Sequence, residues 1–223
     1  MGKWRYKKKT KLFTSRERIM KKKNLKVSDL VPAFVLEDIF RHINNQTKSS
    51  EKKYINNQGK EDAVTGSLFT LLQTDRKVVD DWSWNIDYKI TNQSAKGTFN
   101  ENETGADGIV SINITHNEKI YTKSILFQAK KESNTKGLSE QIKKMDRHLS
   151  GGNMVIIYST SGFYAQTSKT FEVKNDNQIK FDDYLKNIFF ACKSGSWGHN
   201  TYMSNDNPIN LYCLDINITD DVR

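Results

Sequence analysis

The sequence is poor in cysteine and in long apolar runs. Its 223 residues include two cysteines, Cys192 and Cys213, too few for a disulfide framework or a zinc cluster, so we expect two reduced thiols. No stretch approaches the roughly 18 uninterrupted apolar residues that a membrane-spanning helix needs, and the mean hydropathy is −0.72. The first residues also lack the apolar segment of a secretory signal. These absences argue against a disulfide-rich secreted protein and a membrane protein, and they favour a cytoplasmic location.

Two kinds of ligand-binding motif are also missing. The four histidines show no metal-ligand spacing such as HxxxH, so we expect each of them to be structural or exposed. No phosphate-binding GxxxxGK(S/T) segment occurs, so any ATP-driven step would need a separate ATPase or effector partner. Hydrophobic residues nevertheless make up 36% of the chain and aromatic residues 11%, which excludes wholesale disorder and allows a continuous core.

Acidic residues are almost absent from the first 26 residues. This segment holds twelve Lys or Arg and one acid, Glu17, a balance of +11, whereas the rest of the chain has a balance of −2. Such a segment can bind nucleic-acid phosphates through counterion release, or it can be a solvated tail. We therefore divide the chain into a basic arm, 1–26, and a single domain, 27–223. The arm residues expected to contact phosphates are Lys7, Lys8 and Lys9, and the aromatic residues interleaved with the charges are Trp4, Tyr6 and Phe13.

Hydrophobic periodicity predicts a mixed α/β domain. Apolar residues recur at helical spacing in four segments and follow the strand pattern in three others. A continuous apolar run at 153–160 fits a strand buried on both faces, 210–218 fits an edge strand, and the polar segment 45–60 fits a loop. The order implies a central mixed β-sheet flanked by helices. The helical segments are 28–43, 61–74, 137–149 and 181–193, and the strand segments are 82–91, 105–115 and 119–131.

A predicted hairpin brings three polar residues together. Strands 105–115 and 119–131 pair across a turn at 116–119, which puts Asp107 opposite Gln128 within about one residue. Gln128 and Lys130 share one face of their strand because side chains alternate between faces. The alternatives without a chemical role are that Asp107 only begins a turn and that Lys130 is a solvated residue at the end of a strand. Their convergence favours a chemical role.

The combination of an acid, a carboxamide and a lysine suits phosphodiester hydrolysis. Mg²⁺ takes one or two carboxylates and completes its shell with water and substrate oxygens, and a lysine can orient the attacking water or stabilise phosphorane charge. Glu61, in the first turn of a predicted helix, is the candidate for a further carboxylate, although an acid there also stabilises the helix dipole without any other role. The alternatives for this carboxylate are Asp62, Glu101 and Glu103.

Helix residue Glu61, the segment "ADG" with Asp107 and the strand ending "FQAKK" together resemble the PD-(D/E)XK nuclease superfamily, in the QxK variant of Mrr-like restriction endonucleases. The resemblance covers roughly residues 60–165 and implies a restriction-endonuclease-like core. It implies Asp107 as the principal metal ligand, with Gln128 and the Ala129 carbonyl as further ligands of Mg²⁺ or Mn²⁺. It also implies Lys130 at the nucleophilic water, and Glu61 on the metal directly or through water.

The resemblance implies a metal-dependent DNA endonuclease that hydrolyses phosphodiester bonds in bacterial restriction or anti-phage defence, acting as a homodimer. Gln141 and Lys131 are further candidates for contacts with DNA, although a surface glutamine is the commoner explanation for Gln141. Because Gln128 is neutral, the site has one carboxylate fewer than the commoner form of the motif. A catalytically inactive nucleic-acid-binding module of the same fold therefore stays open as the alternative, and a structural or adaptor protein is the third hypothesis.

Overall fold

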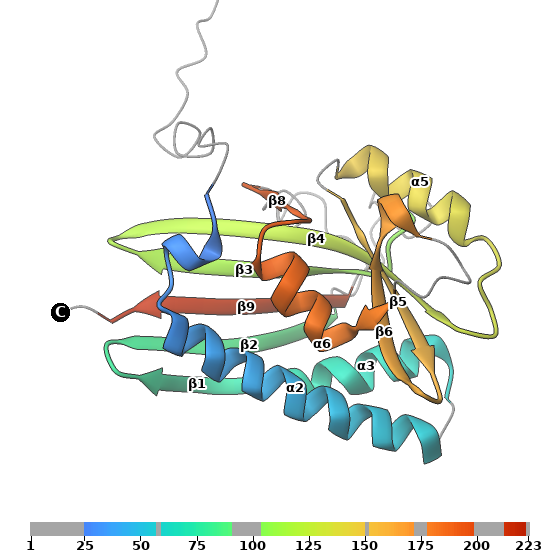
Figure 1. The fold of residues 1–223 in the computed structure, drawn as a ribbon, viewed down its shortest axis with the longest axis horizontal. Coiled ribbons are helices and arrows are strands. Elements are labelled where there is room, and N and C mark those ends of the chain that lie inside the picture. The colour runs from blue at the N-terminus through green and yellow to red at the C-terminus, as the bar shows by residue number, and fades with distance from the viewer. Residues whose placement is uncertain are drawn as a thin grey trace, which may run out of the picture.

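The computed structural model describes residues 25–56, 59–90, 104–149, 152–171, 178–198 and 212–221. Within these residues, one mixed sheet of nine strands forms the centre and helices pack on it (Figure 1). The predicted α/β architecture, a central mixed sheet flanked by helices, is confirmed. No described helix is long and apolar enough to cross a membrane. Most of the basic arm, including Lys7, Lys8 and Lys9, lies outside the described residues, as do Glu101 and Glu103.

The strand order of the sheet is β1-β2-β9-β3-β4-β5-β6-β7, and β8 pairs with β4 off this path. The pairs β3–β9 and β4–β5 are parallel, and the other pairs are antiparallel. β4 is buried at every residue from 122 to 129, because it lies inside the sheet with both faces covered. The strands are β1 (Thr74–Val79), β2 (Trp82–Ile90), β3 (Gly108–His116), β4 (Lys119–Lys131), β5 (Met154–Ser159), β6 (Gly162–Thr167), β7 (Ile179–Lys180), β8 (Ser196–Trp197) and β9 (Tyr212–Asp220).

The helices divide between the two faces of the sheet. α2, α3, α6 and the π-helical turn η3 cover the face that is in front in Figure 1, and α5 packs on the opposite face against β4. Two cores result, a large one on the α2 side and a smaller one under α5. The helical elements are η1 (Val27–Asp29), α2 (Ala33–Asn56), α3 (Glu61–Leu72), α5 (Leu138–His148), η2 (Ser168–Thr170), α6 (Phe181–Tyr184) and η3 (Leu185–Phe190).

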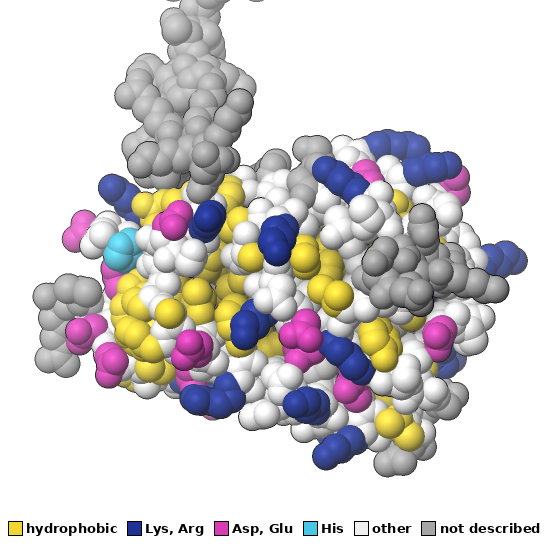
Figure 2. All heavy atoms as spheres, in the orientation of Figure 1, with side chains coloured by type: hydrophobic (Ala, Val, Ile, Leu, Met, Phe, Trp, Pro, Cys, Tyr) yellow, Lys and Arg dark blue, Asp and Glu magenta, His cyan; other side chains and the backbone are white. Residues whose placement is uncertain are grey.

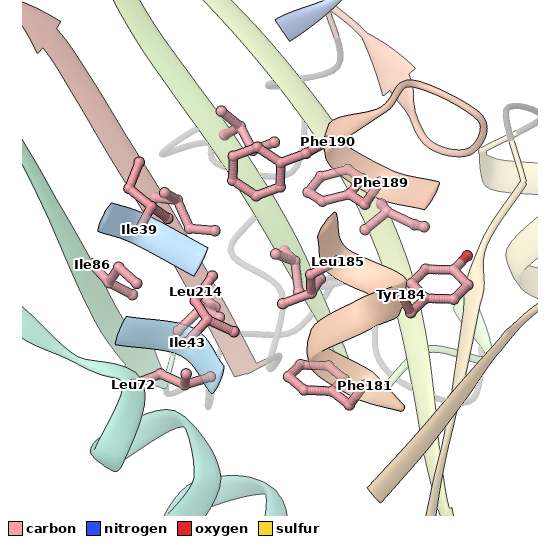
Figure 3. Close-up of a cluster of buried hydrophobic side chains, with 14 of the residues drawn as sticks. Ile39, Ile43, Leu72, Ile86, Phe181, Tyr184, Leu185, Phe189, Phe190 and Leu214 are labelled. Carbon is pink, nitrogen blue, oxygen red and sulfur yellow. The ribbon is translucent and has the colours of Figure 1, made fainter. Parts of the chain in front are cut away.

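The larger core forms where the apolar stripe of α2 meets the sheet. Figure 3 shows Ile39 and Ile43 of α2 beside Ile86 of β2 and Leu214 of β9, and each of these four side chains is at most 1% exposed. Their spacing of four residues puts Ile39 and Ile43 on one side of the helix, as the periodicity predicts. Burying one such side chain contributes about 1.5–3 kcal/mol, so this contact fixes α2 on the sheet.

The predicted loop at 45–60 is wrong, because α2 continues to Asn56. Two polar residues of this segment, Thr47 and Ser50, lie on the same side of the helix as its apolar residues, and each is only 2% exposed. Glu51 reaches the neighbouring hairpin, where its Oε1 accepts a hydrogen bond from the Phe163 N–H at 2.7 Å. Tertiary contacts with β6 therefore stabilise a polar segment whose composition suggests a loop.

The last strand is not the predicted edge strand. β9 lies between β2 and β3 and is paired along its length with both. Leu214 and Ile216 face the larger core, while Cys213 faces the smaller one. The alternation of apolar side chains therefore reflects burial on two faces. Its partners are more than 90 residues away along the chain, which periodicity does not reveal.

Three further elements differ from the prediction. β1 and β6 were not predicted, because β1 is largely exposed and carries charged residues and β6 begins in a stretch rich in small residues. The helix predicted at 181–193 ends at Phe190, and its last six residues form a π-helix. A single π-turn within a longer helix is a common way to adjust side-chain packing.

Gly108, the first residue of β3, allows close packing beside the candidate site. A Cβ atom there would overlap both the ring of Phe127 and the backbone carbonyl of Tyr212 in β9. We expect Gly108→Ala to lower the free energy of unfolding by about 3 kcal/mol, because β3 and β9 would have to separate. Urea unfolding followed by circular dichroism measures the change.

Gly137 provides a matched control for this substitution. A Cβ atom at Gly137 would meet nothing within 4 Å, although its φ of +76° is strained for alanine. Gly137→Ala should therefore cost only about 1 kcal/mol. A loss at Gly108 no larger than the loss at Gly137 would contradict the close packing of β3 against β9.

Candidate active site

The β3–β4 hairpin has the predicted register. Its pairs begin with Gly108 opposite Phe127, so Asp107, directly before β3, lies level with Gln128 in β4. The two residues of the turn, 117–118, both have positive φ, as the favoured two-residue hairpin turns require. The short turn therefore sets the alignment of the two candidate metal ligands.

The backbone of Asp107 is fixed by both neighbouring strands. Its N–H donates to the carbonyl of Phe127 in β4 at 2.9 Å, and its carbonyl accepts from the N–H of Tyr212 in β9 at 3.0 Å. Two residues earlier, Gly105 has φ of +69° and leaves no room for a side chain against the backbone of Gln141 in α5. The strand pair and α5 thus set the position of Asp107.

The carboxylate of Asp107 gathers two donors from β4. Its Oδ2 accepts a hydrogen bond from Gln128 Nε2 at 2.6 Å and another from the Ala129 N–H at 2.8 Å. Gln128 is 0% exposed, and its Nε2 also lies 3.3 Å from the Ala129 carbonyl. The Oε1 atom of Gln128 is buried and has no hydrogen-bond partner among the described residues. Three of the predicted site residues are therefore in direct contact.

Glu61 joins the start of α3 to the end of β4. Its Oε2 lies 3.4 Å from Lys130 Nζ, and these side chains are 22% and 12% exposed. Its Oε1 accepts from the N–H of Lys131 at 3.1 Å and lies 3.5 Å from Asn134 Nδ2. The neighbouring acid, Asp62, is exposed. Of these two helix carboxylates, Glu61 is the one that meets the lysine of the hairpin.

Two tyrosines that the motif did not indicate stand near these carboxylates. The hydroxyl groups of Tyr158 in β5 and Thr65 in α3 are hydrogen-bonded at 2.9 Å. Burial raises the pKa of Tyr158 far above its usual value, although the bond with Thr65 opposes the shift, and the charges of Asp107 and Glu61 add to it. The sequence feature that could have indicated Tyr158 is its hydroxyl group within the otherwise apolar run 153–160.

Tyr212 in β9 is the second of these tyrosines. Its hydroxyl donates to the carbonyl of Asp62 at 3.3 Å. Burial, followed by the negative charge of Asp62, raises the pKa of Tyr212 to about 12. Both phenols therefore remain protonated near neutral pH and can donate hydrogen bonds beside the acids. Nothing in the spacing of the sequence pointed to Tyr212, because β9 was expected at an edge.

The residues proposed to contact DNA are separated in the structure. Gln141 lies on α5 with its backbone against Gly105, and Lys131 binds Glu61 through its backbone N–H. Figure 2 shows Lys or Arg and Asp or Glu side chains interspersed over the face that α2 and α6 cover. This view gives no single-sign surface among the described residues, in keeping with the near-neutral charge of the chain beyond the arm.

The oxygen atoms around Asp107 fit a hard divalent cation better than a soft one. The candidates are the Asp107 carboxylate, the Gln128 carboxamide oxygen and the Ala129 carbonyl, and Mg²⁺ prefers such oxygen ligands with one or two carboxylates. The NH₂ group of Gln128 faces Asp107 in the structure, so its oxygen, which is buried without a hydrogen-bond partner among the described residues, would join these ligands with the carboxamide turned over. Among the described residues, no group of three or more His, Cys, Asp or Glu side chains gathers as a metal site would require. Any ion held here would depend strongly on water and substrate for its remaining ligands.

Comparison of this chain with protein-family models, with curated proteins and with solved structures finds no match. The geometry of the hairpin and of Glu61 is therefore the basis on which a function can be assigned.

Proposed function

We propose that this protein is a Mg²⁺-dependent DNA endonuclease with a restriction-endonuclease-like core, acting in bacterial restriction or anti-phage defence. The observation that carries the proposal is the meeting of Asp107, Gln128 and Ala129 at one end of the sheet, with Lys130 next in the strand and held by Glu61. The element order α3, β1, β2, β3, β4, α5, β5, with β4 and β5 parallel, supports such a core. The insertion of β9 between β2 and β3 is an addition to it.

Each residue has a distinct role in this proposal. Asp107, the Gln128 oxygen and the Ala129 carbonyl would hold a metal ion, which when bound would supply polarisation of a phosphate oxygen and acidification of a water molecule. Lys130 can offer three N–H donors, of which one points to Glu61, so the others can face the attacking water or a phosphate oxygen. Glu61 is a positioning residue, because its second oxygen is tied to the backbone of β4.

DNA is the proposed substrate, and the basic arm is the proposed source of its general affinity. Each phosphate that a protein neutralises adds to the salt dependence of binding, and the arm carries the excess of basic residues. Cutting both strands of a duplex would take two active sites, which is the reason to propose a homodimer.

The comparison of Lys130→Met with Lys131→Met tests the catalytic role directly. Lys130→Met should slow Mg²⁺-dependent nicking of supercoiled plasmid by about 100-fold or more, because it removes the donor proposed for the attacking water or a phosphate oxygen. With protein in saturating excess over the plasmid, Lys131→Met should stay within about threefold of the wild-type cleavage rate, because a contact of Lys131 with DNA would affect binding and its bond to Glu61 runs through the backbone N–H. Nicking by Lys130→Met at the wild-type rate would exclude this site.

A nucleic-acid-binding module without catalysis is the second candidate. The observation in its favour is that the described residues bring only one carboxylate, Asp107, into contact with the Gln128 amide. In that case the wild-type protein binds DNA with a steep salt dependence and leaves the plasmid intact in Mg²⁺ and in Mn²⁺.

A further inference from the structure

The side-chain carboxamide of Gln128 is hydrogen-bonded at only one of its two ends. In the structure its NH₂ group donates to Asp107 Oδ2 at 2.6 Å and lies 3.3 Å from the Ala129 carbonyl. Its oxygen is then buried without a hydrogen-bond partner among the described residues. A fully buried amide oxygen without a partner is unfavourable, so this orientation satisfies Asp107 and leaves the other end of the amide unsatisfied.

The opposite orientation would lose the hydrogen bond from Gln128 to Asp107. A half-turn about the last side-chain bond of Gln128 would exchange its oxygen and nitrogen. The amide oxygen would then stand near Asp107 Oδ2 and the Ala129 carbonyl, where three acceptor oxygens converge. Acceptors without a shared donor repel one another, but they are the ligands that a hard divalent cation prefers. Each orientation therefore suits one condition, the first without a cation and the second with one.

We propose that Gln128 is an amide switch that couples metal binding to release of Asp107. Without a cation, the NH₂ group of Gln128 occupies Asp107, and a divalent cation binds with the amide turned over so that the oxygens of Gln128, Asp107 and Ala129 converge on it. This inference rests on the proposed function and deepens it. The switch sets the metal affinity of the site.

The switch predicts weak binding of metal to the protein alone. Binding must break a hydrogen bond to a charged carboxylate, which weakens the affinity by about 10- to 100-fold relative to a site with free oxygens. Phosphate oxygens of the DNA add ligands that Asp107, Gln128 and Ala129 do not supply. Metal and DNA should therefore each tighten the binding of the other, since such coupling is reciprocal.

Side-chain amide NMR of the wild-type protein tests the switch directly, and a variant is needed only to assign the signals. The Gln128 NH₂ signals, assigned as those missing from Gln128→Met, should move strongly when Mg²⁺ alone is added. Calorimetry run beside it measures how much Mg²⁺ binds. Binding of Mg²⁺ with unmoved Gln128 signals would overturn the switch and leave the nuclease proposal standing.

Gln128→Glu gives the second test, because glutamate has no NH₂ group to occupy Asp107. This variant should bind Mg²⁺ at least about 10-fold more tightly than the wild type, and without metal it should melt at a lower temperature, because two carboxylates then face each other. The matched control is Gln73→Glu, which makes the same charge change at an exposed residue beyond the end of α3 and should alter neither quantity. Equal Mg²⁺ affinity of Gln128→Glu and the wild type would overturn the switch. Absence of Mg²⁺ binding in both proteins, together with absence of cleavage, would overturn the proposed function and the switch with it.

Discussion

Asp107→Asn is expected to slow Mg²⁺-dependent DNA cleavage by about 1,000-fold or more while leaving the fold intact. Asparagine keeps one oxygen that can replace Oδ2 and accept the bonds from Gln128 Nε2 and the Ala129 N–H, which measure 2.6 and 2.8 Å. It loses the negative charge that would hold the metal ion, and a loss of this size corresponds to about 4 kcal/mol in activation free energy. Single-turnover plasmid cleavage and thermal unfolding, measured on the same preparation, separate the two effects.

The choice of asparagine avoids a second effect that alanine would bring. Asp107→Ala would leave the Gln128 NH₂ group and the Ala129 N–H without their acceptor, and each such loss costs about 1–3 kcal/mol of stability. Asp62→Asn is the matched control, because Asp62 is an exposed acid in the first turn of α3. This variant should cleave DNA at close to the wild-type rate. Wild-type cleavage by Asp107→Asn, or a large loss in Asp62→Asn, would contradict the placement of the metal at Asp107.

Lys123→Met is expected to change the pH dependence of stability. Lys123 lies on β4 and is 1% exposed; its Nζ donates to the carbonyl of Ser194 and stands 3.9 Å from the centre of the Phe189 ring. Burial lowers the pKa of Lys123 from 10.5 to about 7, although the neighbouring thiol of Cys192 opposes the shift. No acid forms an ion pair with Lys123 among the described residues, so the cost of burying its charge is not offset there.

The sign of the effect follows from proton binding. Between pH 7 and 10.5 the unfolded chain holds a proton on Lys123 that the folded protein has released, so the free energy of unfolding rises with pH across this window. The change in the free energy of unfolding across this window is on the order of 5 kcal/mol. Lys123→Met lacks this contribution, so its stability relative to the wild type should be greatest at about pH 7 or below and decline toward pH 10.

Urea unfolding at several pH values measures this difference, and subtracting the wild-type curve cancels the titration of other groups. Lys119→Met is the control, since Lys119 is an exposed residue on the same strand and should leave the pH dependence unchanged. A difference between Lys123→Met and the wild type that stays constant with pH would show that Lys123 titrates normally in the folded protein.

The parts of the fold that could be predicted are the local ones. The β3–β4 hairpin followed from alternation and a short turn, which is why Asp107 was correctly placed level with Gln128. The contact between Glu61 and Lys130 was not predicted, because the resemblance implied Glu61 on the metal and Lys130 at the water, and this helix and strand are far apart in the sequence. Where one short turn fixes the geometry, sequence pattern is sufficient.

The parts that could not be predicted depend on distant partners. The position of β9 between β2 and β3 depends on pairings across more than 90 residues, and the polar end of α2 is helical because Thr47 and Ser50 are buried against other elements. Lys123 shares the inward face of β4 with Phe127, yet nothing in the sequence showed that η3 would cover it. Tertiary packing in each case overrode composition.

The most direct test of the proposed function is cleavage of supercoiled plasmid DNA by the wild-type protein in Mg²⁺, with a chelator in the matched sample. The site at Asp107, Gln128 and Lys130 predicts nicked and linear products in Mg²⁺ and intact plasmid with the chelator. A folded protein that binds the plasmid but leaves it intact in both Mg²⁺ and Mn²⁺ would contradict a nuclease and favour a binding module.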